Sequence, residues 1–245
     1  MTKSEEPPVD LDTALAAAVE PLPAGTDGAR VSVAVLDTEN GARAVYGDGA
    51  FDTASVVKVD IAAALLLIAQ DEHRALTAVE RDRATVMIER SDNASATALL
   101  RAIGGPAALD AANARLGLTG TTAAHAWGLT RTTAADRLTL LRAVFGTASE
   151  LGEDSRAYLR GLMERVEAGQ RWGVSAAGSD CALKNGWMPR TTTGLWDINS
   201  IGRVRTGARA CLLAVLSDGH GTKESGIALV ESVARAAVGV LGAAR

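Results

Sequence analysis

Hydrophobic and polar positions follow strand-like spacing at both ends of the chain. Residues 11–22 carry a short helical pattern, after which apolar residues alternate in Val31–Asp37 and in Arg43–Tyr46. Asn40-Gly41 lies between these two segments, and Asn-Gly between alternating segments is a strong signal for a β-hairpin. The chain is therefore predicted to begin with a helix and two antiparallel strands.

Helical spacing dominates the middle of the chain, over 55–169. Pro106 and Gly117 are expected to bound one of these helices, and another runs from Thr132-Thr133 to about Gly146. The whole stretch is predicted to be helical.

Strand patterns return at 179–187, 195–204 and 210–217, and a final Ala- and Val-rich helix is expected over 223–241. The simplest arrangement that buries all these strands is one antiparallel five-stranded sheet. It would be built from both chain ends and have helices on its faces.

The sequence thus predicts an α/β (α+β) fold with two lobes. Residues 1–50 and 170–245 are expected to form the lobe that contains the sheet, and residues 51–169 an all-α lobe. A cleft is expected where the lobes meet.

Composition narrows the class of protein and of partner. The chain has 245 residues, 47% of them hydrophobic, and a net charge of −4 without a basic cluster, so neither nucleic acid nor an anionic membrane surface is an expected partner. The longest apolar run, Ile61–Ala69, is shorter than the roughly 18 residues of a membrane span. Cys181 and Cys211 are too few for a zinc site or a disulfide scaffold and are expected to be buried fillers. No cofactor and no metal are expected, and the protein is expected to be a monomer.

The N-terminal segment Met1–Pro8 is polar and acidic, without the apolar core of a signal peptide. A cytoplasmic location is expected for the chain as written, and an exported one if a leader has been removed.

Three short motifs carry candidate chemistry: Ser55-Val-Val-Lys58, Ser91-Asp-Asn93 and Lys184-Asn-Gly186. None is convincing alone, but all three together are expected by chance in roughly one sequence in a thousand. Ser55 and Lys58 lie one helical turn apart, on one face. The apolar helix that follows would bury Lys58 and lower its pKa, so that a neutral amine accepts the Ser55 proton. A capping serine followed by a surface lysine is the alternative.

These motifs resemble those of the class A β-lactamases and the penicillin-binding D,D-peptidases, which are active-site serine enzymes. Ile103–Pro106, Thr132–Asp136 and Trp172–Val174 are similar to class A sequences at corresponding places, so that the resemblance covers nearly the whole chain. It implies a β-lactamase-like fold and acyl transfer through a serine.

The resemblance implies roles for the matching positions. Ser55 would be the acylated nucleophile and Lys58 its base, Ser91 would relay a proton to the leaving nitrogen, and Asn93 would bind Lys58 and a substrate amide. Lys184 would hold the carboxylate of a small-molecule or peptide substrate.

The third motif is also expected to form part of the substrate site. Gly186 would leave room for substrate along the strand edge, and the backbone N–H groups of Ser55 and Trp187 would form the oxyanion hole. Asn185 stands where the family usually has Thr or Ser, and its amide is expected to bind substrate instead. Asp92 is expected to be structural, as a helix N-cap.

The chain departs from the family in a segment where class A β-lactamases supply a Glu that activates water. Residues 117–131 contain no acid. His125 is the only titratable side chain there that could replace it as a base near neutral pH, with an exposed loop histidine as the alternative. Trp127 is expected to pack this loop down or to form a wall of the cleft.

The family's carboxylate-binding strand arginine has no clear match either. Arg190 is a candidate replacement, with an exposed turn arginine as the other interpretation. Asp197, Asn199 and Ser200 are unusual choices for a central strand, and one of them is expected to face the cleft.

The sequence therefore predicts a serine acyl-transfer hydrolase with slow or atypical deacylation. Its activity would be that of a D,D-peptidase, an esterase or a weak β-lactamase. A biosynthetic transacylase and a homologue that binds β-lactams or peptides without hydrolysing them are the alternatives.

Overall fold

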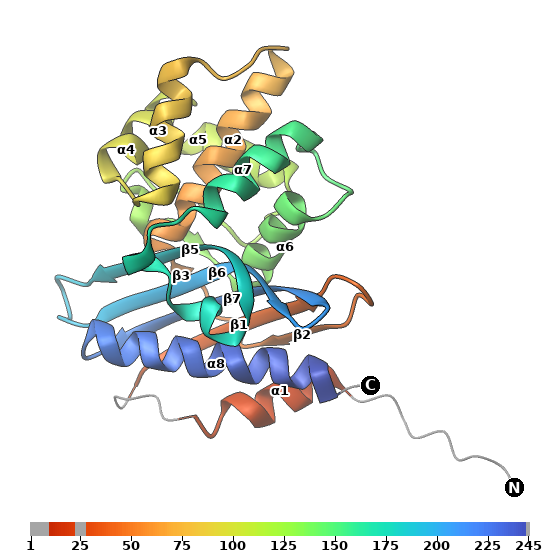
Figure 1. Cartoon of the computed structure of the whole chain (residues 1–245). Coiled ribbons are helices and arrows are strands. Elements are labelled where there is room, and N and C mark those ends of the chain that lie inside the picture. Colours follow the sequence, from red (N-terminus) through yellow and green to blue (C-terminus); the bar gives the residue numbers. More distant parts are fainter. Residues whose placement is uncertain (1–9, 23–27, 244–245) are drawn as a thin grey trace, which may run out of the picture.

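The computed structural model describes residues 10–22 and 28–243. In this part of the chain five strands form an antiparallel sheet in the order β2-β1-β7-β6-β5 (Figure 1). The strands are β1 (Arg30–Asp37), β2 (Arg43–Tyr46), β5 (Ser179–Pro189), β6 (Trp196–Thr206) and β7 (Arg209–His220). The predicted five-stranded sheet from both chain ends is confirmed.

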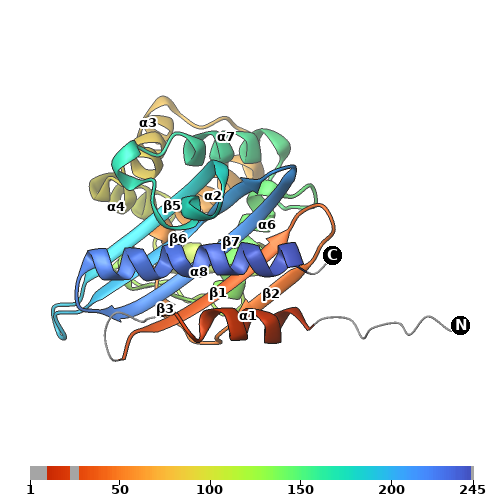
Figure 2. The same ribbon diagram turned by 60° about the horizontal axis from the view of Figure 1, so that its bottom comes forward.

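Helices cover both faces of this sheet. Figures 1 and 2 show α1 (Leu11–Val19) and α8 (Lys223–Ala243) on one face. The opposite face meets α6 (Ala134–Phe145), and the other helices lie beyond it: α2 (Lys58–Asp71), α3 (Ala78–Glu89), α4 (Asn93–Ala102), α5 (Pro106–Arg115) and α7 (Glu153–Glu164). Because both faces are covered, the central strand β7 is buried without alternation from Cys211 to Ser217.

Helix α8 is the one helix in the described residues that is long and apolar enough, by length and composition, to cross a membrane. It lies along the sheet, and its buried residues recur at helical spacing: Gly226, Leu229, Val230, Val233, Ala234, Ala237, Val238 and Leu241. Its apolar stripe is therefore used to cover the core.

The middle of the chain is not entirely helical, which corrects the sequence-based prediction. A short strand β3 (Phe51–Asp52) pairs with β4 (Arg131–Thr132), and 127–129 form a 3₁₀ turn. This pairing joins segments that are far apart in the sequence, so local periodicity carries no sign of it. Helix α1 also ends at Val19 rather than at 22, because Pro21 cannot donate a helical hydrogen bond.

Three further predictions concern the cysteines, the N-terminal segment and the division into lobes. Cys181 and Cys211 are both buried and free, as expected. The N-terminal residues 1–9, on which the prediction about a leader depends, lie outside the described residues. The division into two lobes stays a prediction.

A buried ion pair joins the first helix after the hairpin to the helix that covers the sheet. Asp60 on α2 accepts a hydrogen bond from Arg137 on α6, and neither side chain is exposed to solvent. Burial raises the pKa of the Asp60 carboxyl, and the Arg137 guanidinium opposes that shift. Thr121 adds an acceptor for Arg137 at 3.2 Å. The pair links α2 to α6. A charge left without its partner at this buried position would lower the stability of the fold.

We expect Arg137→Met to lower the free energy of unfolding by about 3–5 kcal/mol, because it leaves Asp60 buried without its counterion. The double variant Asp60→Leu/Arg137→Met should recover much of that loss, since no buried charge remains. Urea unfolding followed by far-UV circular dichroism measures both values. A double variant as unstable as the single one would contradict this account.

Candidate active site

The backbone that carries Ser55 is held in a rarely populated conformation. Ala54 has φ +45° and opens a 3₁₀ helix, Ala54–Val57, that runs directly into α2 at Lys58. A non-glycine residue in the left-handed region costs about 1–2 kcal/mol, and such strain tends to gather at functional sites. Ser55 thereby lies one turn from Lys58, as the motif spacing predicts.

The Lys58 amine lies at the centre of the predicted catalytic residues. Its Nζ is within hydrogen-bond distance of four oxygens: Ser55 Oγ at 3.0 Å, Ser91 O at 2.7 Å, Ser91 Oγ at 3.0 Å and Asn93 Oδ1 at 2.8 Å. An ammonium has only three hydrogens, whereas a neutral amine can donate two and accept one from a hydroxyl. The geometry therefore suits an amine that exchanges a proton with Ser55 or Ser91.

Burial changes the proton affinity of this amine. Loss of hydration lowers the pKa of Lys58 to about 8, and the nearby Asp92 carboxylate partly opposes the shift. Every hydrogen-bond partner of Lys58 in the described residues is a neutral oxygen, so no direct ion pair restores the charge. An appreciable fraction of Lys58 is thus neutral near physiological pH.

Ser91 connects Lys58 to the second buried lysine. Lys184 Nζ donates to Ser91 Oγ at 3.0 Å and to the Asn185 carbonyl at 2.9 Å. Burial, together with the charge of Lys58, holds the pKa of Lys184 well below its usual value. Ser91 itself has φ +57°, and Asp92 caps α4 by accepting from Ser95 N at 2.6 Å. The structural role expected of Asp92 is therefore confirmed.

Strand β5 forms the edge of the sheet and passes very close to Ser55. A Cβ placed on Gly186 would lie 2.7 Å from the Ser55 nitrogen and 2.9 Å from the Thr53 carbonyl oxygen. Both atoms belong to the backbone and cannot move aside cheaply, so only glycine fits between the strand edge and the turn before α2.

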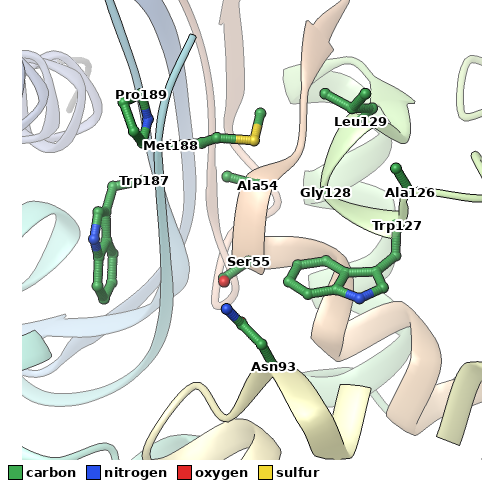
Figure 3. A pocket seen from close by; sticks show the side chains of 10 residues that line it. All are labelled: Ala54, Ser55, Asn93, Ala126, Trp127, Gly128, Leu129, Trp187, Met188 and Pro189. Carbon is green, nitrogen blue, oxygen red and sulfur yellow. The ribbon is translucent and has the colours of Figure 1, made fainter. Parts of the chain in front are cut away.

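A pocket of about 390 Å³ opens beside Ser55 (Figure 3). The side chains of Ser55 and Asn93 point toward each other at its floor, and the Trp127 indole forms one wall. Apart from Ser55 and Asn93, the lining consists of apolar or aromatic residues and glycine: Ala54, Ala126, Trp127, Gly128, Leu129, Trp187, Met188 and Pro189. The lining contains no acidic side chain.

Trp127 is one residue whose importance local sequence reasoning only partly recognised. It forms the pocket wall, which is one of the two roles expected for it. Its ring also lies over Lys58, with the ring centroid 4.7 Å from Nζ, and its Nε1 donates to Thr97 Oγ1 at 3.2 Å. Nothing in the sequence indicates this contact, because it joins two segments about 70 residues apart.

The Asn185 side chain does not face this pocket, which corrects its expected role in binding substrate. Its Nδ2 donates to the backbone carbonyls of Gln170 and Trp172 at 2.8 and 2.9 Å. Strand alternation explains the result. Positions 184 and 186 of β5 face α2, so the side chain at position 185 lies on the opposite face of the strand. The Trp187 indole likewise lies across β5 from Ser55, packed edge-on against Trp172.

The structure separates His125 and Arg190 from Ser55. His125 is exposed and lines a neighbouring hollow with Arg101, on the other side of Trp127. Arg190 is paired with Asp52, and its Nη1 lies 3.5 Å from Asp197 Oδ2. Neither side chain lines the Ser55 pocket, so the loop base and the replacement arginine expected from the sequence are not assembled there.

Asp197, Asn199 and Ser200 of β6 do not line the Ser55 pocket, and of the three Asn199 contacts the segment before Ser55. Asn199 donates from Nδ2 to the carbonyls of Asp52 and Thr53 at 2.9 and 3.1 Å, just before Ser55. Ser200 Oγ accepts from Val174 N at 2.9 Å. Asn199 is therefore a positioning residue, and its sequence signal is an amide at a buried position of a central strand.

Comparison with known proteins agrees with this geometry. The model of the family described as the beta-lactamase enzyme family matches residues 76–241. Comparison with curated proteins found no match.

Solved structures of several relatives have a similar fold. A class A beta-lactamase from Bacteroides cellulosilyticus is 19% identical, with 94% of this chain and 96% of that chain covered, at a TM-score of 0.78. A beta-lactamase from Xanthomonas campestris is 22% identical, with 96% and 100% covered, at 0.78. A variant of PBP-A, solved as an acyl-enzyme complex with penicillin G, is 20% identical, with 95% and 96% covered, at 0.79.

The lowered pKa of Lys58 predicts how stability depends on pH. Between its folded value of about 8 and its ordinary value of 10.5, the unfolded chain binds a proton that folded Lys58 has released. The native state should therefore gain stability, relative to Lys58→Met, as pH rises through this window. From pH 7 to pH 9.5 we expect the difference in free energy of unfolding to grow by about 1–2 kcal/mol, measured by urea unfolding. A difference that does not change with pH would show that Lys58 keeps its ordinary proton affinity.

Proposed function

Because the chain belongs to the beta-lactamase enzyme family, we propose that it is a serine acyl-transfer hydrolase that forms an acyl-enzyme on Ser55 and releases it slowly. The observation that carries this proposal is the partly neutral Lys58 amine, 3.0 Å from Ser55 Oγ and 3.0 Å from Ser91 Oγ. These contacts join a nucleophile (Ser55), a base (Lys58) and a proton relay (Ser91) in one hydrogen-bond network.

Acylation follows from these contacts. Neutral Lys58 takes the Ser55 proton as Ser55 Oγ attacks the substrate carbonyl carbon, and the oxyanion that forms accepts hydrogen bonds from the N–H groups of Ser55 and Trp187. The proton then passes from Lys58 through Ser91 to the leaving nitrogen as the carbon–nitrogen bond breaks. Lys58 is neutral again, and the acyl group remains on Ser55 as an ester.

The charges around the relay favour a substrate that carries a carboxylate. Lys184 contacts Ser91 Oγ, and in its protonated form this second buried amine adds positive potential at the relay, although burial lowers its pKa. No acidic side chain lines the pocket. A small molecule or peptide with a carboxylate beyond its scissile amide or ester would be attracted to that potential.

Deacylation lacks a dedicated base. Residues 117–131 contain no acid, and the residues of this segment that line the pocket are Ala126, Trp127, Gly128 and Leu129. Hydrolysis of the Ser55 ester needs a group that takes a proton from water, which typically contributes 10²–10⁴-fold to the rate. Slow deacylation follows. The penicillin G acyl-enzyme of the PBP-A variant, a protein of similar fold, supports penicillin G as the probe.

We expect intact-protein mass spectrometry to show one penicillin G added to the native chain, with the adduct persisting after free drug is removed. Ser55→Ala should show no adduct, because it lacks the nucleophile. Ser179→Ala, at an exposed position on β5, is the matched serine control and should acylate as the native chain does.

Three results would count against this proposal. An adduct in Ser55→Ala would place acylation elsewhere, and rapid loss of drug without any adduct on the native chain would mean that deacylation is fast. No adduct and no loss of drug would favour a homologue that does not react with β-lactams.

We also propose a transacylase as the second candidate, because the apolar pocket lining favours an organic acceptor over water. With a small amine such as glycine added to the penicillin-loaded protein, the adduct should decay faster as the amine concentration rises, and the new amide should be detected by mass. A decay rate that does not depend on the amine would leave the hydrolase as the better account.

A further inference from the structure

Trp127 contacts the Lys58 amine in addition to the oxygens around it. Ser55, Ser91 and Asn93 supply oxygens to the amine, and the indole ring faces Nζ with its centroid 4.7 Å away. Figure 3 shows the ring beside Ser55 and Asn93. At this separation no water fits between the ring and the amine.

The indole is also held in place. Its Nε1 donates to Thr97 Oγ1 on α4 at 3.2 Å, and the 3₁₀ turn that carries Trp127 is fixed at its end, where Thr130 N donates to the Trp127 carbonyl at 3.1 Å. Thr53 N in turn donates to the carbonyl of Thr130 at 2.9 Å, next to the segment that carries Ser55. The ring therefore faces Lys58 from a fixed position.

An aromatic face attracts a cation, and the attraction is stronger where water is excluded. Lys58 is buried, so the ring favours its ammonium form and opposes the effect of burial. The other charged groups near the amine are Asp92, which also favours the ammonium, and Lys184 on β5, whose own pKa is lowered by burial and by the charge of Lys58.

We propose that Trp127 is a positioning residue whose ring keeps Lys58 protonated in the acyl-enzyme and keeps water from the side of Lys58 that could activate it. This inference rests on the proposed function for its acyl-enzyme step. After the relay Lys58 is neutral, and solvent returns a proton to give the ammonium. The ammonium has no lone pair with which to take a proton from water, so the Ser55 ester survives.

The chain offers a direct test because it contains only four lysines: Lys3, Lys58, Lys184 and Lys223. Lysine labelled with ¹³C at Cε gives one NMR signal for each, and the loss of one signal in Lys58→Met assigns Lys58. Trp127→Leu removes the ring and should lower the titration midpoint of Lys58 by about 0.5–1.5 pH units. Trp127→Phe keeps a ring with a weaker attraction and should lower it by less.

A second lysine–tryptophan contact serves as the internal control. Lys223 Nζ lies over the Trp187 ring, 4.3 Å from its centroid, across β5 from Ser55. The Lys223 signal should not move in either Trp127 variant, which also verifies that each variant is folded.

The consequence for the acyl-enzyme is measured separately. A fall of one unit from a pKa of about 8 raises the neutral fraction of Lys58 at pH 7 about fivefold. Over the expected shift of about 0.5–1.5 units we therefore expect the penicillin G adduct of Trp127→Leu to decay about 2.5- to 8-fold faster than the native adduct at pH 7, and that of Trp127→Phe to decay at an intermediate rate.

Several results would overturn the inference. An unchanged Lys58 midpoint in Trp127→Leu would show that the ring does not act on the charge, and equal shifts in the Leu and Phe variants would assign the effect to packing alone. A shifted midpoint with unchanged adduct decay would refute the link to acyl-enzyme lifetime. If the native chain forms no adduct, the proposed function fails while the titration still tests the effect of Trp127 on Lys58.

Discussion

The site depends on the burial of two lysine amines, those of Lys58 and Lys184, neither of which contacts a carboxylate in the described residues. Their hydrogen-bond partners in the described residues are neutral oxygens, supplied by hydroxyl, amide and backbone carbonyl groups. Burial of a charge under these conditions is unfavourable, and the cost is reduced when the amine releases its proton. Loss of hydration, which makes a buried charge unfavourable for the fold, therefore also favours the neutral amine that the proposed acyl transfer needs.

Three separate parts of the chain are held together to maintain this arrangement. The turn before α2 presents Ser55, the start of α4 and the residues just before it present Asn93 and Ser91, and edge strand β5 presents Lys184 and Gly186. Positive φ at Ala54 and Ser91 indicates backbone strain in two of these three parts. Buried polar contacts, among them the Asn199 amide on the carbonyls before Ser55, hold the strained segments in place.

The wall of the pocket opposite β5 carries no titratable side chain. It carries an indole, glycine and aliphatic residues, so it offers no proton acceptor. The apolar wall also strengthens the electrostatic effects around Lys58 because it keeps the local dielectric low. An aromatic ring is one of the few groups that can contact an ammonium at such a place without supplying a base.

The sequence by itself determined the five strands of the large sheet, the approximate bounds of α5, α6 and α8, and the three motifs. These features depend on periodicity, on residues such as Pro106 and Gly117, and on residues within one helical turn, all of which act locally. The spacing of Ser55 and Lys58 was sufficient to place them on one face. The tertiary structure decided which side of β5 each residue of the third motif faces, so that Lys184 approaches Ser91 while the Asn185 amide points away. It also decided that Trp127 covers Lys58, that His125 lies outside the pocket and that Asn199 supports the turn before Ser55. These contacts join segments far apart in the chain, and their geometry is set by the packing of strands and helices, to which local sequence patterns are insensitive.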